Sequence, residues 1–164
     1  LHGLKRAHID DIDVIVLDAI FDGAVVRSML EALEGGAMVV AILNAPSAVD
    51  AVSKVLGYIE PIESIRARAV FAKHLLCVIA QRLVHKIGGG RTLAYEFLPN
   101  KEIVPKVLST GTIDQLSHIL RNMNGFDATT IEKSLATLVQ NGTIRLEDAL
   151  LEAPDPNFLK ELLR

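Results

Sequence analysis

The stretch VIVLDAIFD, residues 14–22, decides the fold class of this 164-residue chain. Its first four residues form an unbroken apolar run, which is typical of a parallel β-strand covered on both faces. Asp18 follows directly, at the position where strands of α/β proteins usually carry their chemistry. The next residues, Ala19, Ile20 and Phe21, cannot accept a proton, so the stretch holds no general base beside Asp18.

Helical patterns alternate with a second strand after this stretch. Apolar side chains at helical spacing predict a helix over 24–34, ended by Gly35-Gly36 in a left-handed conformation. The run AMVVAIL at 37–43 is again typical of a buried strand. The order of elements therefore indicates an α/β fold. The apolar positions of the predicted helix are Val26, Met29, Leu30 and Leu33.

Two further helices are predicted before the pattern changes. In NAPS, residues 44–47, Asn44 is suited to cap a helix that Pro46 would start, and Ser47 is an alternative cap. That helix continues to Gly57. An amphipathic helix is expected within 61–75, with its apolar face marked by Ile62, Ile65 and Val70.

The second half of the chain no longer alternates strands with helices; it predicts a hairpin followed by helices only. The β-leaning runs 77–87 and 92–98, joined by GGGR, predict an antiparallel hairpin with a loose glycine turn. Everything after Pro99 has helical patterns. We therefore expect an α/β core over 1–98 and a helical subdomain over 99–164. The predicted helical segments lie near 101–109, 112–123, 129–140 and 146–163.

Composition excludes several classes of protein. The net charge of −3, with no Lys/Arg cluster, argues against a nucleic-acid partner bound through its phosphates. No apolar run approaches the roughly 20 residues of a membrane span. The one cysteine, Cys77, can form no internal disulfide, which favours a cytoplasmic location. Because the chain opens on Leu1 without Met or a signal sequence, we expect it to be part of a longer polypeptide.

Common site motifs are absent from the sequence. No glycine precedes Lys-Ser or Lys-Thr, so GGGR at 88–91 is interpreted as a turn and not as a phosphate loop. The acidic IDDID at 9–13 could bind a cation, although a solvated turn is favoured. No serine has the context of a nucleophile. The histidines have no metal-ligand spacing; they are His2, His8, His74, His85 and His118.

Several stretches together resemble a known family, the secretion ATPases of type IV pili and type II secretion, above all the PilT-type twitching-motility ATPases. They are LKRAHIDDIDVIVLDAIFD, EALEGGAMVVAILNAPSAVDAV, VIAQRLVHKIGGGR and LVQNGTIRLEDAL. The resemblance implies an α/β, RecA-like P-loop NTPase core in a hexameric motor. This chain would supply a partial core, without the phosphate-loop half, together with the antiparallel hairpin and the C-terminal helical subdomain.

The resemblance also assigns roles to individual positions. VIVLDAIFD is similar to the family's Walker B strand, with Asp18 at the Gly position, Ala19 at the catalytic Glu position and Phe21 at the Arg position. The final acid, Asp22, is kept. LNAPS is similar to the His box, with Asn44 at the histidine position. This implies nucleotide-binding positions at Asp18 and Asn44, no catalytic residue and no metal site in this chain.

Two functions follow from this degenerate pattern. The first is a non-hydrolysing structural or regulatory subunit of a type IV pilus machine. The second is an active hexameric ATPase for pilus retraction or assembly, whose phosphate loop lies upstream and in which Asp18 holds Mg²⁺. The resemblance implies ATP and Mg²⁺ in a complete protein, none for this chain alone, and no nucleic acid. Expected partners are a second copy, a ring of related ATPase subunits and the pilus inner-membrane platform protein.

Two details differ between branches of the family. QRLVHKIGGGR, residues 81–91, continues without the paired CxxC motifs of many assembly ATPases, which favours the retraction branch. EIVPKVL at 102–108 departs from the helix motif of that branch, because Pro105 lies inside it. We also expect a chain that begins at Leu1 to lack central strands of the sheet and to expose the apolar flanks of VIVL and AMVVAIL.

Overall fold

The computed structural model describes residues 12–20, 22–59, 64–101, 103–123 and 128–164. The described residues form two compact units. The first combines the chain up to Leu76 with Asn100–Leu116, and the second combines Cys77–Pro99 with Ser117–Arg164. The predicted boundary between 98 and 99 stays a prediction. No described helix is both long enough and apolar enough to cross a membrane.

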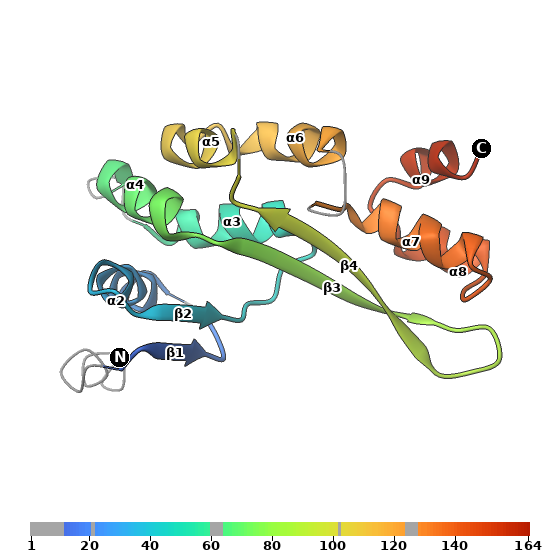
Figure 1. Cartoon of the computed structure of the whole chain (residues 1–164), viewed down its shortest axis with the longest axis horizontal. Helices are drawn as coiled ribbons and strands as arrows, with labels where there is room; N and C mark the ends of the chain where they lie inside the picture. The colour runs from blue at the N-terminus through green and yellow to red at the C-terminus, as the bar shows by residue number, and fades with distance from the viewer. Residues whose placement is uncertain (1–11, 21, 60–63, 102, 124–127) are drawn as a thin grey trace. The chain divides into compact units, whose positions relative to one another are not determined.

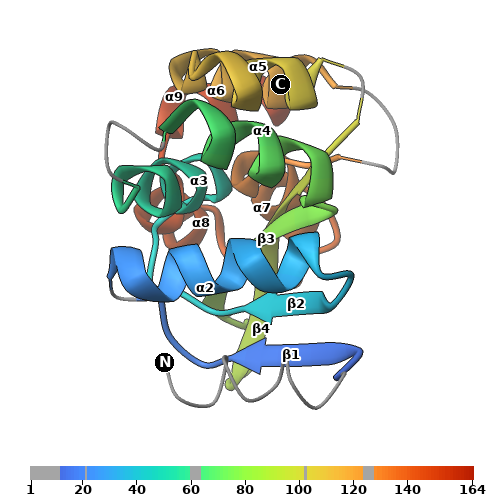
Figure 2. The same cartoon turned by 90° about the vertical axis from the view of Figure 1, so that its left-hand side faces the viewer.

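The first unit contains a parallel pair of strands (Figure 1). Strand β1, Val14–Leu17, pairs with β2, Met38–Ala41, and Val14 lies opposite Met38. Helix α2, Gly23–Glu34, connects them and runs alongside both strands (Figure 2). The two buried members of this small core are Ile15 and Ala32; Leu17, Ala37 and Val39 pack against them.

Within the described part of the chain, only one face of this pair of strands is covered, so the expectation of strands buried on both faces is wrong there. The other face exposes a continuous apolar surface, the sheet face, whose members are 43 to 65% exposed. The predicted exposure of apolar side chains in VIVL and AMVVAIL is therefore confirmed. The sheet face comprises Ile12, Val14, Val16, Met38, Val40 and Ile42.

Local signals in the sequence explain where the first helices begin and end. The Asp22 carboxylate accepts a hydrogen bond from Val25 N at 2.7 Å and so caps α2. Gly36 has a φ of 97°, as predicted for the end of that helix. Helix α3, Ala48–Gly57, is capped by Ser47, whose hydroxyl accepts from Asp50 N at 3.0 Å. Asn44 is therefore not the cap.

Helix α4, Ser64–His74, buries a different face from the one predicted. Ile65 is 82% exposed, whereas Ala67, Phe71 and Ala72 are buried. The prediction gave weight to large apolar residues, but small ones allow close packing with a neighbouring helix, here α5, Val104–Thr110. Of the other two predicted markers, Val70 is partly buried and Ile62 lies outside the described residues.

Two polar contacts attach the segment before α5 to the end of α4. The Asn100 amide donates to Ala72 O at 2.7 Å and Leu75 O at 2.9 Å, which satisfies carbonyls at the end of α4.

Gly111 ends α5 in the left-handed conformation, with a φ of 78°. A Cβ at Gly111 would lie 2.8 Å from Arg68 Nη1, but the end of the Arg68 side chain can move, so the left-handed φ is what favours glycine here. The 3₁₀ turn η2, Ile113–Gln115, follows.

The second unit is built on the predicted antiparallel hairpin. Strand β3, Cys77–His85, pairs along its whole length with β4, Arg91–Pro99. Gly88, Gly89 and Gly90 all have positive φ, so GGGR is a turn, as interpreted. The core of the unit joins Val84 and Ala94 of the hairpin to the helices that follow.

Four helices accompany the hairpin. Helix α6, Leu116–Asn122, follows η2, and α7, Ile131–Gln140, supplies the buried Leu135. The single helix predicted over 146–163 is wrong, because the segment forms two helices separated near Pro154. Proline disfavours helical backbone in the residue before it, and Asp155 caps the new helix. The two helices are α8, Leu146–Glu152, and α9, Pro156–Leu162.

Candidate functional site

The carboxyl ends of β1 and β2 lie at the same edge of the parallel pair. Leu17 lies opposite Ala41, and Ile42 N donates to Leu17 O at 2.8 Å. Asp18 is the first residue beyond β1, and Asn44 is the third beyond β2, so the structure places both at this edge. Both residues are exposed. Strand ends of this kind are where α/β proteins bind ligands.

A cation that the sequence did not single out lies at the same edge. Lys54 of α3 donates from Nζ to the backbone O of Asn44 at 3.0 Å. Side chains on a helix tilt towards its N-terminus, which lets Lys54 reach back to the segment that precedes α3. The helical pattern and the Ser47 cap, seven residues earlier, are the signals that could have indicated this reach.

The other positions that resemble the family's Walker B strand place no further acid at the edge. Ala19 is exposed and Ile20 is buried. Phe21 lies outside the described residues. The carboxylate of Asp22, the one acid kept from the family pattern, caps α2 through Val25 N. Its position is therefore explained by the helix alone, without a ligand.

The donor set at the edge is only part of a nucleotide site. One carboxylate, Asp18, and one amide, Asn44, offer the hard oxygen atoms that Mg²⁺ accepts. A nucleotide also needs backbone N–H groups around its phosphates, and the three consecutive glycines form a hairpin turn instead. The described residues thus fit ATP and Mg²⁺ incompletely, and nucleotide binding by Asp18 and Asn44 stays a prediction.

Within the described part of the chain, no group of three or more His, Cys, Asp or Glu side chains could hold a metal ion. His74, His85 and His118 belong to that part and join no such group. Asp13 is exposed, while Asp10 and Asp11 of the acidic stretch, together with His2 and His8, lie outside the described residues.

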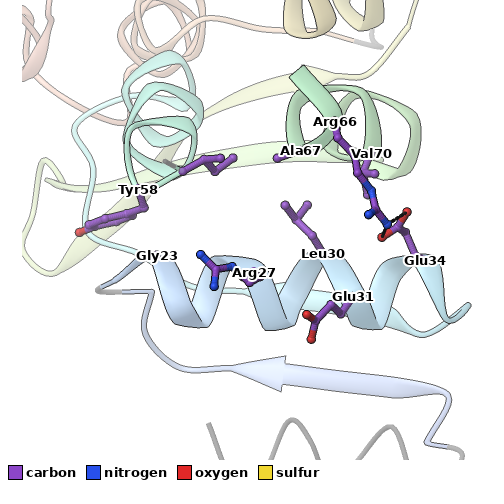
Figure 3. Close-up of a pocket in the computed structure, with 10 residues that line it drawn as sticks. Gly23, Arg27, Leu30, Glu31, Glu34, Tyr58, Arg66, Ala67 and Val70 are labelled. Carbon is purple, nitrogen blue, oxygen red and sulfur yellow. Dashed lines mark hydrogen bonds and ion pairs between the residues drawn. The ribbon is translucent and has the colours of Figure 1, made fainter. Parts of the chain in front are cut away.

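A separate cavity of about 310 Å³ opens in the first unit, between α2, α4 and the end of α3. Figure 3 shows Arg66 extending from α4 to Glu34 on α2, and its Nη2 lies 3.1 and 3.2 Å from the two carboxylate oxygens. The sequence did not suggest this cavity, and neither Asp18 nor Asn44 lines it. The lining residues are Gly23, Arg27, Leu30, Glu31, Glu34, Tyr58, Ile59, Arg66, Ala67 and Val70.

No protein-family model matches the chain. Individual proteins of pilus and twitching-motility systems are similar to it. The type IV pilus retraction ATPase PilT of Pseudomonas aeruginosa is 28% identical over 156 residues, covering 94% of this chain and 45% of that protein. A twitching motility protein of Neisseria gonorrhoeae is 27% identical over 149 residues, covering 90% of this chain and 40% of its own length. The chain thus spans less than half of these relatives.

A solved structure agrees with the sequence relatives. The crystal structure of the pilus retraction motor PilT with bound ADP superposes with a TM-score of 0.87 at 30% identity, covering 98% of this chain and 45% of that one. The predicted fold class is confirmed: a partial α/β core of the ATPase type, an antiparallel hairpin and a helical C-terminal region. In sequence and in fold, the chain corresponds to the C-terminal half of a PilT-like twitching-motility ATPase.

Proposed function

We propose that this chain is a degenerate pilus-motor ATPase domain, a pseudoenzyme that serves as a structural or regulatory subunit of a twitching-motility machine. The observation that carries the proposal is the chemistry of the strand edge. Asp18, Ala19 and Asn44 stand where the family resemblance implies glycine, glutamate and histidine. All three residues are exposed at this edge.

The altered positions weaken hydrolysis for two physical reasons. Activating a water for attack on a phosphoryl group needs a positioned acceptor, and removing such a base typically costs about 10²- to 10⁴-fold in rate. Ala19 accepts no proton. Asn44 can donate a hydrogen bond but carries no charge, so it stabilises the developing negative charge less than a protonated histidine would.

The expected assembly follows from the same family. In the proposed role the chain joins related ATPase subunits in a hexameric ring and contacts the inner-membrane platform protein of the pilus. It works in the cytoplasm, at the membrane through these partners, and binds no nucleic acid. ATP and Mg²⁺ belong to the complete site, in which Asp18 and Asn44 lie near the phosphates. The relatives named for pilus retraction and twitching motility support this setting.

A second function is favoured by the place of Asp18. A carboxylate directly after β1 is suited to hold Mg²⁺, as an ordinary Walker B aspartate does, and an active ATPase would then use Asp18 in place of the lost glutamate. Removing this carboxylate distinguishes the two functions. In an active enzyme Asp18→Asn abolishes turnover, and in a pseudoenzyme there is no turnover to lose.

Phosphate release tests the proposal. The chain is assayed alone and joined to the phosphate-loop half of a PilT relative, with ATP binding measured in parallel. We expect no release above background from the chain alone, and ATP binding with release well below about 1 s⁻¹, an ordinary enzyme rate, from the joined protein. Turnover at that rate that is lost in Asp18→Asn would replace the pseudoenzyme with the active ATPase.

A further inference from the structure

The β3–β4 hairpin has one covered face and one exposed apolar face. Directly opposite residues of an antiparallel pair share a face, so the register defines both. Val84 and Ala94 lie on the covered face, in the core of the second unit. The opposite face, which we call the hairpin face, carries four large side chains that are 43 to 61% exposed. They are Ile79, Leu83, Leu93 and Tyr95.

The hairpin face is positive at the end near the turn. On the same face, the pair after Leu83 and Leu93 is His85 opposite Arg91, and Arg91 carries the positive charge. No aspartate or glutamate occurs among the residues on this face of either strand. A partner that fits it therefore combines an apolar side chain with acidic groups on one side.

Helix α8 offers that combination on the opposite side of the same unit. Ala149 is fully buried in the core with Val84. Glu147 and Leu151 are each two residues from Ala149, about 200° round the helix, and so point away from the core. Leu151 is 84% exposed, and Asp148 lies on the same turn as Glu147.

We propose that the hairpin face of one copy binds the outer side of α8 in a second copy. Leu151 would pack between Leu83, Leu93 and Tyr95, while Glu147 and Asp148 approach Arg91. The two surfaces point in opposite directions, so a chain cannot satisfy both by itself, and the contact is head to tail. Such heterologous contacts produce rows or closed rings of subunits. The inference does not depend on the proposed loss of hydrolysis.

Mixing two complementary variants of the full chain tests this contact. Leu83→Asp disrupts the hairpin face and Leu151→Asp disrupts the α8 surface. Ile65→Asp is the control, because Ile65 is an exposed residue on α4. Sedimentation should show concentration-dependent association of the wild type and of Ile65→Asp, and a monomer for each of the other two. An equimolar mixture of Leu83→Asp and Leu151→Asp should give a dimer and nothing larger, because one complementary pair of surfaces remains.

Charge reversal gives a second readout that leaves the apolar surfaces intact, should an Asp variant fail to fold. Arg91→Glu and Glu147→Lys should each weaken association about tenfold, and the double variant should recover most of the loss. Lys160→Glu, on α9, is the matched control and should have no effect. A wild type that is monomeric at about 100 μM overturns the proposal. So does a Leu151→Asp variant that associates like the wild type, or a mixture that stays monomeric.

Discussion

At the scale of single residues, the strand edge shows how far the sequence could predict the site. The apolar run before Asp18 and the run before Asn44 were enough to predict that both follow strands of one sheet, because parallel strands end at the same edge. Lys54 was not predicted, because its role depends on a side chain reaching from the second turn of α3 to Asn44 O. The helical pattern and the Ser47 cap place Lys54 on the right helix, but they do not identify the backbone oxygen that it contacts.

Restoring glutamate at position 19 and histidine at position 44 should restore ATP hydrolysis if the strand edge has kept its geometry. In the polypeptide joined to a phosphate-loop half, Ala19→Glu with Asn44→His returns an acceptor and a donor that can carry charge, so we expect phosphate release to rise by about 10²-fold or more. Ala69→Glu, at an exposed position on α4, is the control and should leave the rate unchanged. A double variant that folds and binds ATP without faster release would mean that the edge no longer has the geometry for hydrolysis.

At the scale of elements, the sequence predicted those whose causes are local. The glycine turn of the hairpin and the end of α2 follow from the conformational freedom of glycine. The division between α8 and α9 was missed, although Pro154 and Asp155 are local signals, because the apolar pattern on either side suggested one helix. The buried face of α4 depends on its contact with α5, and such tertiary contacts cannot be inferred from the periodicity of α4 alone.

Asp155 shows how the division between α8 and α9 is stabilised. Its carboxylate caps α9 by accepting a hydrogen bond from Phe158 N at 3.1 Å. The same carboxylate pairs with Arg121 of α6 at 2.8 Å. The Arg121 guanidinium lies 4.7 Å from the centre of the Phe158 ring. The Asp155 backbone N–H donates to the buried Glu132 of α7 at 3.1 Å. Three helices thus meet at Asp155.

The charge of Asp155 should make the stability of this junction depend on pH. The hydrogen bond from Phe158 N, followed by that from Arg121, lowers the pKa of the Asp155 carboxyl from its ordinary value of 3.8. As the pH falls, Asp155 therefore takes up its proton in the unfolded chain before it does so in the folded chain. The stabilisation that the Asp155 charge gives to the folded state is present above the unfolded pKa and is lost as the pH falls through the folded pKa.

Thermal unfolding measured between about pH 5 and pH 2.5 checks this contribution. Asp155→Asn keeps a capping oxygen but removes the charge, so its melting temperature should fall less on acidification than that of the wild type. Asp114→Asn, at an exposed position, is the control and should keep the wild-type slope. Equal slopes for all three proteins would show that the charge of Asp155 contributes nothing measurable.

At the scale of the whole molecule, the sheet face is the feature that most needs a partner. Two parallel strands covered on one side leave six large apolar side chains in water, and parallel sheets are normally covered on both sides. The chain spans less than half of its PilT relatives. We therefore expect a polypeptide of the phosphate-loop type, in the same chain or a separate one, to extend this sheet and cover the face.

Cysteine labelling tests this expectation directly. With the exposed Cys77 replaced by Ala, Val16→Cys and Val40→Cys should react rapidly with a maleimide in the 164-residue chain. Joining or adding the phosphate-loop half should slow both reactions at least tenfold, because burial excludes the reagent, whereas Ile65→Cys on α4 should react at an unchanged rate. If Val16→Cys and Val40→Cys stay equally reactive in a joined protein that binds ATP, the phosphate-loop half does not cover the sheet face. The six apolar side chains would then belong to an interface of another kind, and slow labelling that appears only as the concentration of the chain rises would identify a second copy on this face.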